Sequence, residues 1–190
     1  MLIDPKYILA LLATLFLTSC VSGIWTGANL VYDRYSVYKT LSDYKLSRAA
    51  NSALFNKRGS KCPTCLIDIT VFKEDVLISG HVTTQEIANT LSNRLLEVSG
   101  YRHLYNKVMV APNALPQTLE DSWITMKVRS QIMQNSNIDP NAFKIVTTDG
   151  IVYIMGEARV EQGHAVINIA RQTRGVRKVV SLVHYLVEAA

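Results

Sequence analysis

The sequence predicts an α+β protein made of two tandem αββαβ units, each a three-stranded sheet with two helices on one face. Three observations support this fold class. The same order of helical and strand-like periodicities occurs twice, in residues 41–111 and 119–190. A connector with two prolines, residues 112–118, separates the two stretches. Each stretch is long enough for one small core, because two helices on one sheet face enclose a single apolar layer.

Composition and charge narrow the functional classes. The 190-residue chain is 48% hydrophobic and 18% charged, as is typical of a globular protein, and its formal net charge is +5. A modest basic excess suits an anionic surface without identifying one. Nucleic acid is not expected as a partner, because the N-terminus has the features of an export signal.

Residues 1–19 have the composition of a secretory signal peptide. Lys6 precedes an uncharged apolar run that ends in small residues. The run from residue 7 to residue 19 is too short to cross a bilayer as a permanent helix. We therefore expect this segment to direct export and then to be removed.

The signal-like segment ends in Leu17-Thr18-Ser19-Cys20, which is similar to the lipobox of bacterial lipoproteins. The similarity implies that Cys20 is acylated on its sulfur and on its new amino group, so that residues 20–40 form a lipidated leader. Val21 stands where many Gram-negative bacteria place the aspartate that retains a lipoprotein in the inner membrane. The implied location is therefore the outer membrane, facing the periplasm; the alternative is an ordinary signal with a chance cysteine.

Each unit begins with a helix that has one apolar stripe. Apolar residues recur at spacing i, i+4, i+8 in both helices, which places them on one face. The first stripe is Leu46, Ala50 and Leu54, and the second is Ile124, Val128 and Ile132. We expect these stripes to face the two cores.

Two short strand-like segments follow each first helix. In the second unit FKIVTT and IVYIMG flank Asp149-Gly150, a strong hairpin signal because both turn positions favour positive φ. In the first unit IDITVF and VLISG flank Lys73-Glu74-Asp75, a turn that has no glycine. A hairpin is therefore predicted in both units, with the stronger signal in the second.

A second helix and a last strand complete each unit. Gly100 and Gly175 follow the two helical patterns, where a glycine commonly ends a helix. The segments YRHLYNKVMV and VRKVVSLVHYLV are then strand-like by their alternation and β-branched content. The helical core positions are Ala88, Leu91, Leu95 and Val98 in the first unit, and Gly163, Val166, Ala170 and Thr173 in the second.

The two units, the helix ends VSGY and TRGV, and the lipobox together resemble the dual BON-domain outer-membrane lipoproteins of bacteria. The likeness is strongest in the second unit, in DSWITMKVRSQI and VTTDGIVYIMG. The first unit departs from it by the loop RGSKCPTC and by the missing turn glycine. The resemblance implies a non-catalytic module that interacts with phospholipid and supports envelope integrity.

The first helix of the second unit has a second apolar face. At about 100° per residue, Trp123, Met126, Ser130 and Met133 lie opposite the core stripe, with Lys127 and Arg129 on either side. Indole, thioether and cationic side chains suit the headgroup region of an anionic phospholipid membrane. The alternative is that this face docks on the first unit or on a protein partner of the envelope.

Two other basic surfaces are less distinctive. The corresponding face of the first unit has one aromatic residue and no tryptophan. It consists of Lys45, Arg48, Ser52 and Phe55. Near the end of the second unit, four cations either extend an anionic-lipid surface or form a solvated helix end. These are Arg171, Arg174, Arg177 and Lys178.

The remaining cysteines and the histidines give no catalytic motif. Cys62 and Cys65 could close a local disulfide in an oxidising compartment, or stay as two thiols; their position before a strand is the reverse of a thioredoxin-like site. The four histidines are far apart without metal-ligand spacing, so isolated surface or edge positions are expected and no metal or cofactor is predicted. They are His81, His103, His164 and His184. The oligomeric state is left open.

Overall fold

The computed structural model describes residues 29–55 and 65–186, with side chains from residue 40 onward. The signal-like segment, Cys20 and Cys62 lie outside the described residues. Apart from residues 29–37 at the start of the first helix, the described parts of both αββαβ domains belong to one compact unit, Tyr38–Ala190. Among the described residues, no helix is both long enough and apolar enough to cross a membrane.

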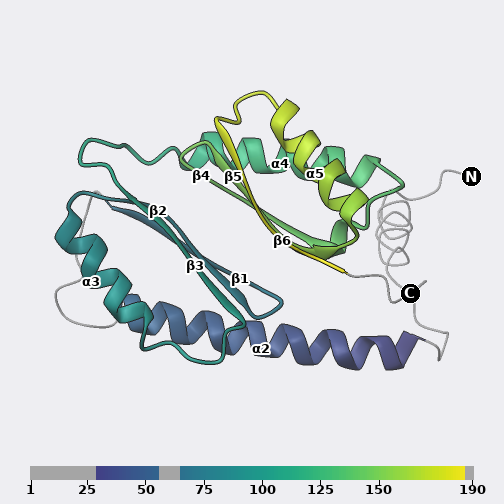
Figure 1. Ribbon diagram of the computed structural model, residues 1–190, viewed down its shortest axis with the longest axis horizontal. Coiled ribbons are helices and arrows are strands. Elements are labelled where there is room, and N and C mark those ends of the chain that lie inside the picture. The colour runs from purple at the N-terminus through teal and green to yellow at the C-terminus, as the bar shows by residue number, and fades with distance from the viewer. Residues whose placement is uncertain (1–28, 56–64, 187–190) are drawn as a thin grey trace, which may run out of the picture. The chain divides into compact units, whose positions relative to one another are not determined.

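Two domains with the same element order form the structure (Figure 1). The first contains α2 (Asn29–Phe55), β1 (Leu66–Phe72), β2 (Asp75–Val82), α3 (Gln85–Leu95) and β3 (His103–Val110). The second contains α4 (Thr118–Gln134), a 3-10 turn η1 (Pro140–Ala142), β4 (Phe143–Thr148), β5 (Ile151–Ala158), α5 (Val160–Gln172) and β6 (Lys178–Tyr185). The predicted α+β class and tandem αββαβ order are confirmed.

The two sheets have the same topology. Their strand orders are β1-β2-β3 and β4-β5-β6. The hairpin strands are antiparallel, and the last strand runs parallel to the middle one. The parallel pair requires a crossover connection, which α3 and α5 supply. The second helix of each domain thus returns the chain to the end of the sheet where the middle strand begins, and the last strand occupies the edge opposite the first strand.

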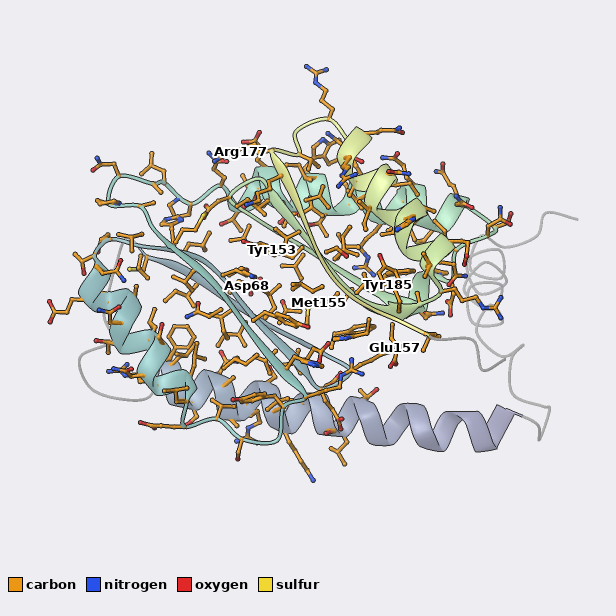
Figure 2. The ribbon with its side chains drawn as sticks, in the orientation of Figure 1. Asp68, Tyr153, Met155, Glu157, Arg177 and Tyr185 are labelled. Atoms are coloured by element: carbon orange, nitrogen blue, oxygen red, sulfur yellow. The ribbon has the colours of Figure 1, made fainter. Side chains whose placement is uncertain are left out.

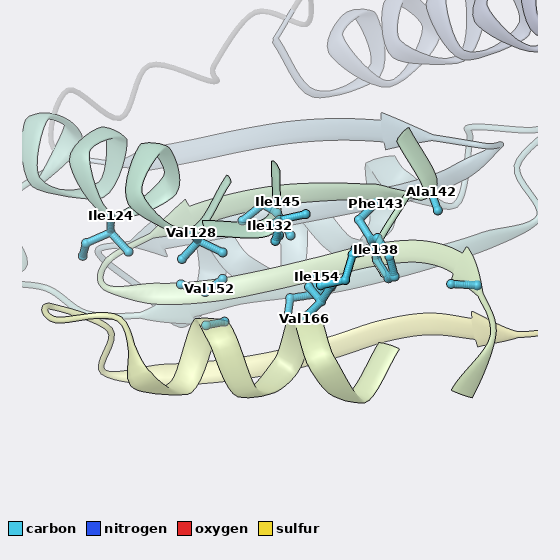
Figure 3. Packing of buried hydrophobic residues seen from close by; sticks show 12 residues of the cluster. Ile124, Val128, Ile132, Ile138, Ala142, Phe143, Ile145, Val152, Ile154 and Val166 are labelled. Carbon is cyan, nitrogen blue, oxygen red and sulfur yellow. The ribbon is translucent and has the colours of Figure 1, made fainter. Parts of the chain in front are cut away.

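The predicted apolar stripes are buried. In the second domain Ile124, Val128 and Ile132 of α4 pack with Val152 and Ile154 of β5 in one cluster (Figure 3). In the first domain the corresponding stripe of α2 is 5% exposed or less and packs on β2 and α3. Each stripe therefore joins its helix to the sheet of its own domain.

A carboxylate from the first helix of each domain holds the hairpin turn of that domain. Asp121 accepts hydrogen bonds from the backbone N–H groups of Asp149 and Gly150, both at 2.8 Å. Asp43 accepts them from Lys73 and Glu74, at 2.9 and 2.8 Å. All four turn residues have positive φ. The first domain therefore makes the same two-residue turn without a glycine, because a fixed acceptor stabilises it.

The second face of each sheet is buried at its middle strand, which the sequence did not predict. The sequence predicts one covered face, but every residue of β2 is buried and β5 is buried except for Glu157. A third apolar cluster combines Leu77 of β2 with Tyr153 and Met155 of β5. Figure 2 labels Tyr153 and Met155. The two domains therefore share a core that lies between their sheets.

Candidate functional site

The outward face of α4 carries large apolar side chains. Trp123 is 55% exposed, Met126 53% and Met133 72%. Leu119, one turn earlier on the same face, is 90% exposed. These residues occupy positions i, i+4, i+7 and i+14, so they form one stripe along the helix. We call Leu119, Trp123, Met126 and Met133 the α4 stripe.

Leu119 is absent from the sequence-based site. Its spacing of four residues before Trp123 is the signal that would have identified it. The apolar face expected from the sequence begins at Trp123, whereas α4 begins at Thr118. The stripe therefore extends over nearly the whole length of the helix.

Lys127 borders the stripe on one side. Its Nζ lies 5.3 Å from the centroid of the Trp123 ring and donates a hydrogen bond to the carbonyl oxygen of Arg174 at 3.3 Å. Gln131 of α4 also donates to the Thr173 hydroxyl at 3.0 Å. The end of α5 therefore lies beside α4. Four exposed cations extend from this end of α5 to the start of β6: Arg171, Arg174, Arg177 and Lys178.

A groove lies on the other side of the stripe. Its volume is about 990 Å³, and α4, β4 and β1 line it. Met126 and Met133 contribute thioethers, and the exposed cations Arg129 and Lys144 stand at the same groove. Ser130 is exposed next to Arg129. The structure thus places cations on both sides of the stripe.

The corresponding face of α2 in the first domain carries fewer large apolar side chains than the α4 stripe. Lys45, Arg48 and Ser52 are exposed, and Phe55 is 45% exposed at the end of α2. At the four positions that match the α4 stripe, α2 has two large apolar side chains, Phe55 and Leu41, which is 48% exposed. Exposed apolar side chains with cations beside them, as membrane binding requires, are therefore more numerous on α4 than on α2.

The α4 stripe is not part of the apolar core that the two domains share. The sequence leaves open that this face docks on the first unit, but the shared core is built from β2 and β5 instead. Polar contacts accompany it: His81 Nδ1 donates to Asp149 at 2.8 Å, and the hydroxyls of Ser79 and Thr148 are 2.9 Å apart. The expectation that His81 lies at the surface is wrong, because it is fully buried.

A second polar cluster surrounds Asp75, which is 2% exposed at the start of β2. Its carboxylate accepts hydrogen bonds from Arg102 at 3.0 and 3.1 Å, from His103 at 3.0 Å and from His184 at 2.8 Å. Burial acts to raise the pKa of Asp75, but these hydrogen bonds and the charge of Arg102 lower it below its usual value. His103 and His184 are therefore not isolated, contrary to the sequence-based expectation.

The cysteine prediction is only partly covered by the structure. Cys65 precedes β1 and is disulfide-bonded. Cys62 lies outside the described residues, so its pairing with Cys65 stays a prediction.

Comparison with known proteins identifies the repeated unit. The family model of the BON domain matches residues 65–112 and 120–186, which together are more than half of the chain. Both matched segments contain the two strands, the helix and the last strand of one αββαβ domain. The second also includes most of α4. The resemblance inferred from the sequence is confirmed.

Two curated relatives extend this comparison. The outer membrane lipoprotein DolP of Haemophilus influenzae is 26% identical over 193 residues, covering 98% of this chain and all of the relative. The 21 kDa hemolysin of Actinobacillus pleuropneumoniae is 27% identical over 121 residues, or 63% of this chain and 62% of the relative. Among solved structures, CdsD of the Chlamydia trachomatis type III secretion system is 19% identical, with a TM-score of 0.31 over 76% of this chain and 63% of that chain.

Proposed function

Because this chain belongs to the BON domain family and contains two such domains, we propose that it is a non-catalytic lipoprotein of the bacterial envelope that binds anionic phospholipid through the α4 stripe. The proposal includes an acylated Cys20, an outer-membrane anchor facing the periplasm, and support of outer-membrane integrity. The similarity to an outer membrane lipoprotein along 98% of the chain supports the envelope location.

The observation that carries the lipid proposal is the exposure of four large apolar side chains in one line on α4. Their exposed fractions range from 53% to 90%. Cations lie on both sides, Lys127 and Arg174 on one and Arg129 and Lys144 on the other. Insertion of the stripe at headgroup depth would bring these cations to the phosphates.

The expected affinity is modest. Burying one large apolar side chain contributes roughly 1.5–3 kcal/mol, and each cation near an anionic surface adds about 1 kcal/mol. Loss of motional freedom on binding cancels much of this sum. A protein already tethered by acyl chains does not need a higher membrane affinity, because the tether raises the effective concentration of lipid at the stripe.

Vesicle flotation tests the proposal on an unlipidated chain that carries Cys20→Ala and lacks the apolar residues 1–19, which would themselves bind vesicles. We expect it to float with vesicles that contain phosphatidylglycerol and to stay unbound with pure phosphatidylcholine. Raising the salt concentration from about 0.1 M to about 1 M should weaken binding, because it shortens the Debye length from about 10 Å to about 3 Å. Trp123→Ala should lower the partition coefficient by at least ~10-fold.

Phe55→Ala is the matched control. Phe55 is an exposed aromatic residue at the corresponding place in the first domain, and its removal should leave flotation unchanged. Equal losses in the two variants would mean that the α4 stripe has no special role. Absence of flotation in the parent chain would favour the alternative, in which the same face binds a protein partner of the envelope.

A further inference from the structure

Three metal-ligating side chains from three strands converge beside the shared core. Asp75 begins β2, His103 begins β3 and His184 lies near the end of β6. One ligand atom from each lies within 4.8 Å of the other two. The parallel register pairs Asp75 with His103, which explains their proximity, whereas His184 comes from the second domain.

We propose that Asp75, His103 and His184 bind one divalent transition-metal ion, with Zn²⁺ as the best match. Two imidazole nitrogens and one carboxylate oxygen form a donor set that zinc accepts, with water in the fourth position. His103 is about half exposed, so solvent can reach that position. The lipid surface on α4 does not include this cluster, although all three residues lie within the segments that the BON-domain model matches.

The contacts of the two histidines with Asp75 are slightly shorter than the separations between ligand atoms around a coordinated ion. His103 Nδ1 and His184 Nε2 lie 3.0 and 2.8 Å from the two oxygens of Asp75. Tetrahedral zinc with bonds of about 2.1 Å separates its ligand atoms by about 3.4 Å. The two rings are stacked with their centroids 4.5 Å apart, so binding requires each ring to turn until its nitrogen points at the ion. Zinc would replace the protons that now bridge nitrogen and oxygen.

The positive charge of Arg102 repels the metal ion and therefore lowers the affinity of the site for it. Its guanidinium contacts both oxygens of Asp75 and also donates to Glu157 at 3.2 Å. Glu157 offers the guanidinium a second carboxylate as the metal approaches. Asp75 can then use one oxygen for zinc while the other keeps a hydrogen bond from Arg102, as outer-sphere partners of metal-binding carboxylates often do. The positive charge remains close, so the affinity should be moderate.

Metal binding at this cluster would join the two domains. Asp75 and His103 belong to the first domain and His184 to the second, so the complete donor set exists only when the shared core is formed. A ligand that binds the folded state alone raises the unfolding temperature. Zinc should therefore stabilise the whole chain and not one domain.

Equilibrium dialysis of the full chain in detergent against ZnCl₂ tests the proposal, after metal has been removed with a chelator. We expect one zinc ion bound through this cluster with a roughly micromolar dissociation constant and an increase in unfolding temperature. His103→Ala and His184→Ala should each weaken binding by at least ~10-fold. His164→Ala is the matched control, because His164 is exposed outside the cluster, and it should bind like the parent chain.

Arg102→Gln gives an independent test with the opposite sign. Removing the guanidinium charge should tighten zinc binding by about 10-fold, whereas a cluster that is only a hydrogen-bond network would gain nothing. Co²⁺ in place of Zn²⁺ should give the visible absorption of a tetrahedral site in the parent chain but not in the His103→Ala/His184→Ala variant. Equal zinc uptake by the parent chain and that double variant, each folded by circular dichroism, would overturn the proposal.

Discussion

Asp43 and Asp121 occupy the same position in the two domains, and each accepts two backbone hydrogen bonds from the hairpin turn of its own domain. Each lies three residues before the first residue of its core stripe, Leu46 or Ile124. The helix thus fixes both the core and the turn. This pairing makes the start of the first helix important for the position of the hairpin.

Asp121→Ala should therefore destabilise the protein strongly. The carboxylate is 4% exposed and accepts two bonds from N–H groups that would be left without it. Two such losses correspond to about 2–4 kcal/mol in the free energy of unfolding. Urea denaturation measures this loss, and Glu120→Ala, an exposed neighbour with the same charge change, should cost less than about 0.5 kcal/mol. Similar effects for the two variants would contradict the turn-holding role.

Gly80→Ala should be far more damaging than Gly100→Ala. Both glycines have positive φ, but a Cβ at Gly80 would collide with the carbonyl group of Leu66, whereas Gly100 has open space. The backbone cost alone is about 1 kcal/mol, which is the effect expected at Gly100. At Gly80 the collision adds to it by disturbing the β1–β2 pairing. Thermal unfolding of both variants compares the two costs, and equal losses would show that only φ matters.

The lowered pKa of Asp75 predicts a specific acid sensitivity. A carboxyl group with a lower pKa in the folded state contributes stability above its unfolded pKa of about 3.9 and loses it as the pH falls through the folded value. The free energy of unfolding should therefore fall as the pH is lowered below about 4. In Asp75→Asn the fall in the free energy of unfolding below pH 4 should be smaller, because the titrating carboxyl group is gone. At pH 7 the free energy of unfolding should be lower than in the parent chain by about 3 kcal/mol. Urea denaturation between pH 7 and pH 3 measures both effects; an unchanged acid slope would refute the assignment.

The elements with regular patterns were predictable from the sequence. Ile124, Val128 and Ile132 repeat every four residues, and Asp149-Gly150 has the residues of a two-residue turn, so local spacing was sufficient. The second buried face of β5 was not predictable in this way. An alternating strand shows which residues share a face but does not identify what covers the other face.

The Asp75 cluster was missed for a related reason. His103 and His184 are separated from Asp75 by 28 and 109 positions, and no local spacing links them. Their contact depends on the β2–β3 register and on the packing of one domain against the other. Asp43 and Asp121, by contrast, could have been found by aligning the two units, because they precede the core stripes by the same number of residues.

The contact of His81 with Asp149 should couple the two domains energetically. The pair is buried, and among the described residues His81 Nε2 has no hydrogen-bond partner, so Nδ1 carries the polar contact of the ring. A double-mutant cycle with His81→Ala and Asp149→Asn should give a coupling energy of about 1–3 kcal/mol. Asparagine tolerates the positive φ of Asp149, which keeps the turn intact. A coupling energy near zero would mean that the pair adds nothing to the contact between domains.

Leu119→Ala tests whether the lipid surface includes the first turn of α4. Leu119 is 90% exposed, so its removal should leave the unfolding temperature unchanged while it removes roughly 1.5–3 kcal/mol of membrane burial. Flotation with phosphatidylglycerol vesicles should therefore weaken by about 10-fold or more. Leu96→Ala is the matched control, because Leu96 is 75% exposed at the end of α3 in the first domain. If Leu119→Ala floats like Leu96→Ala, the membrane contact begins at Trp123 and the first turn of the helix stays in water.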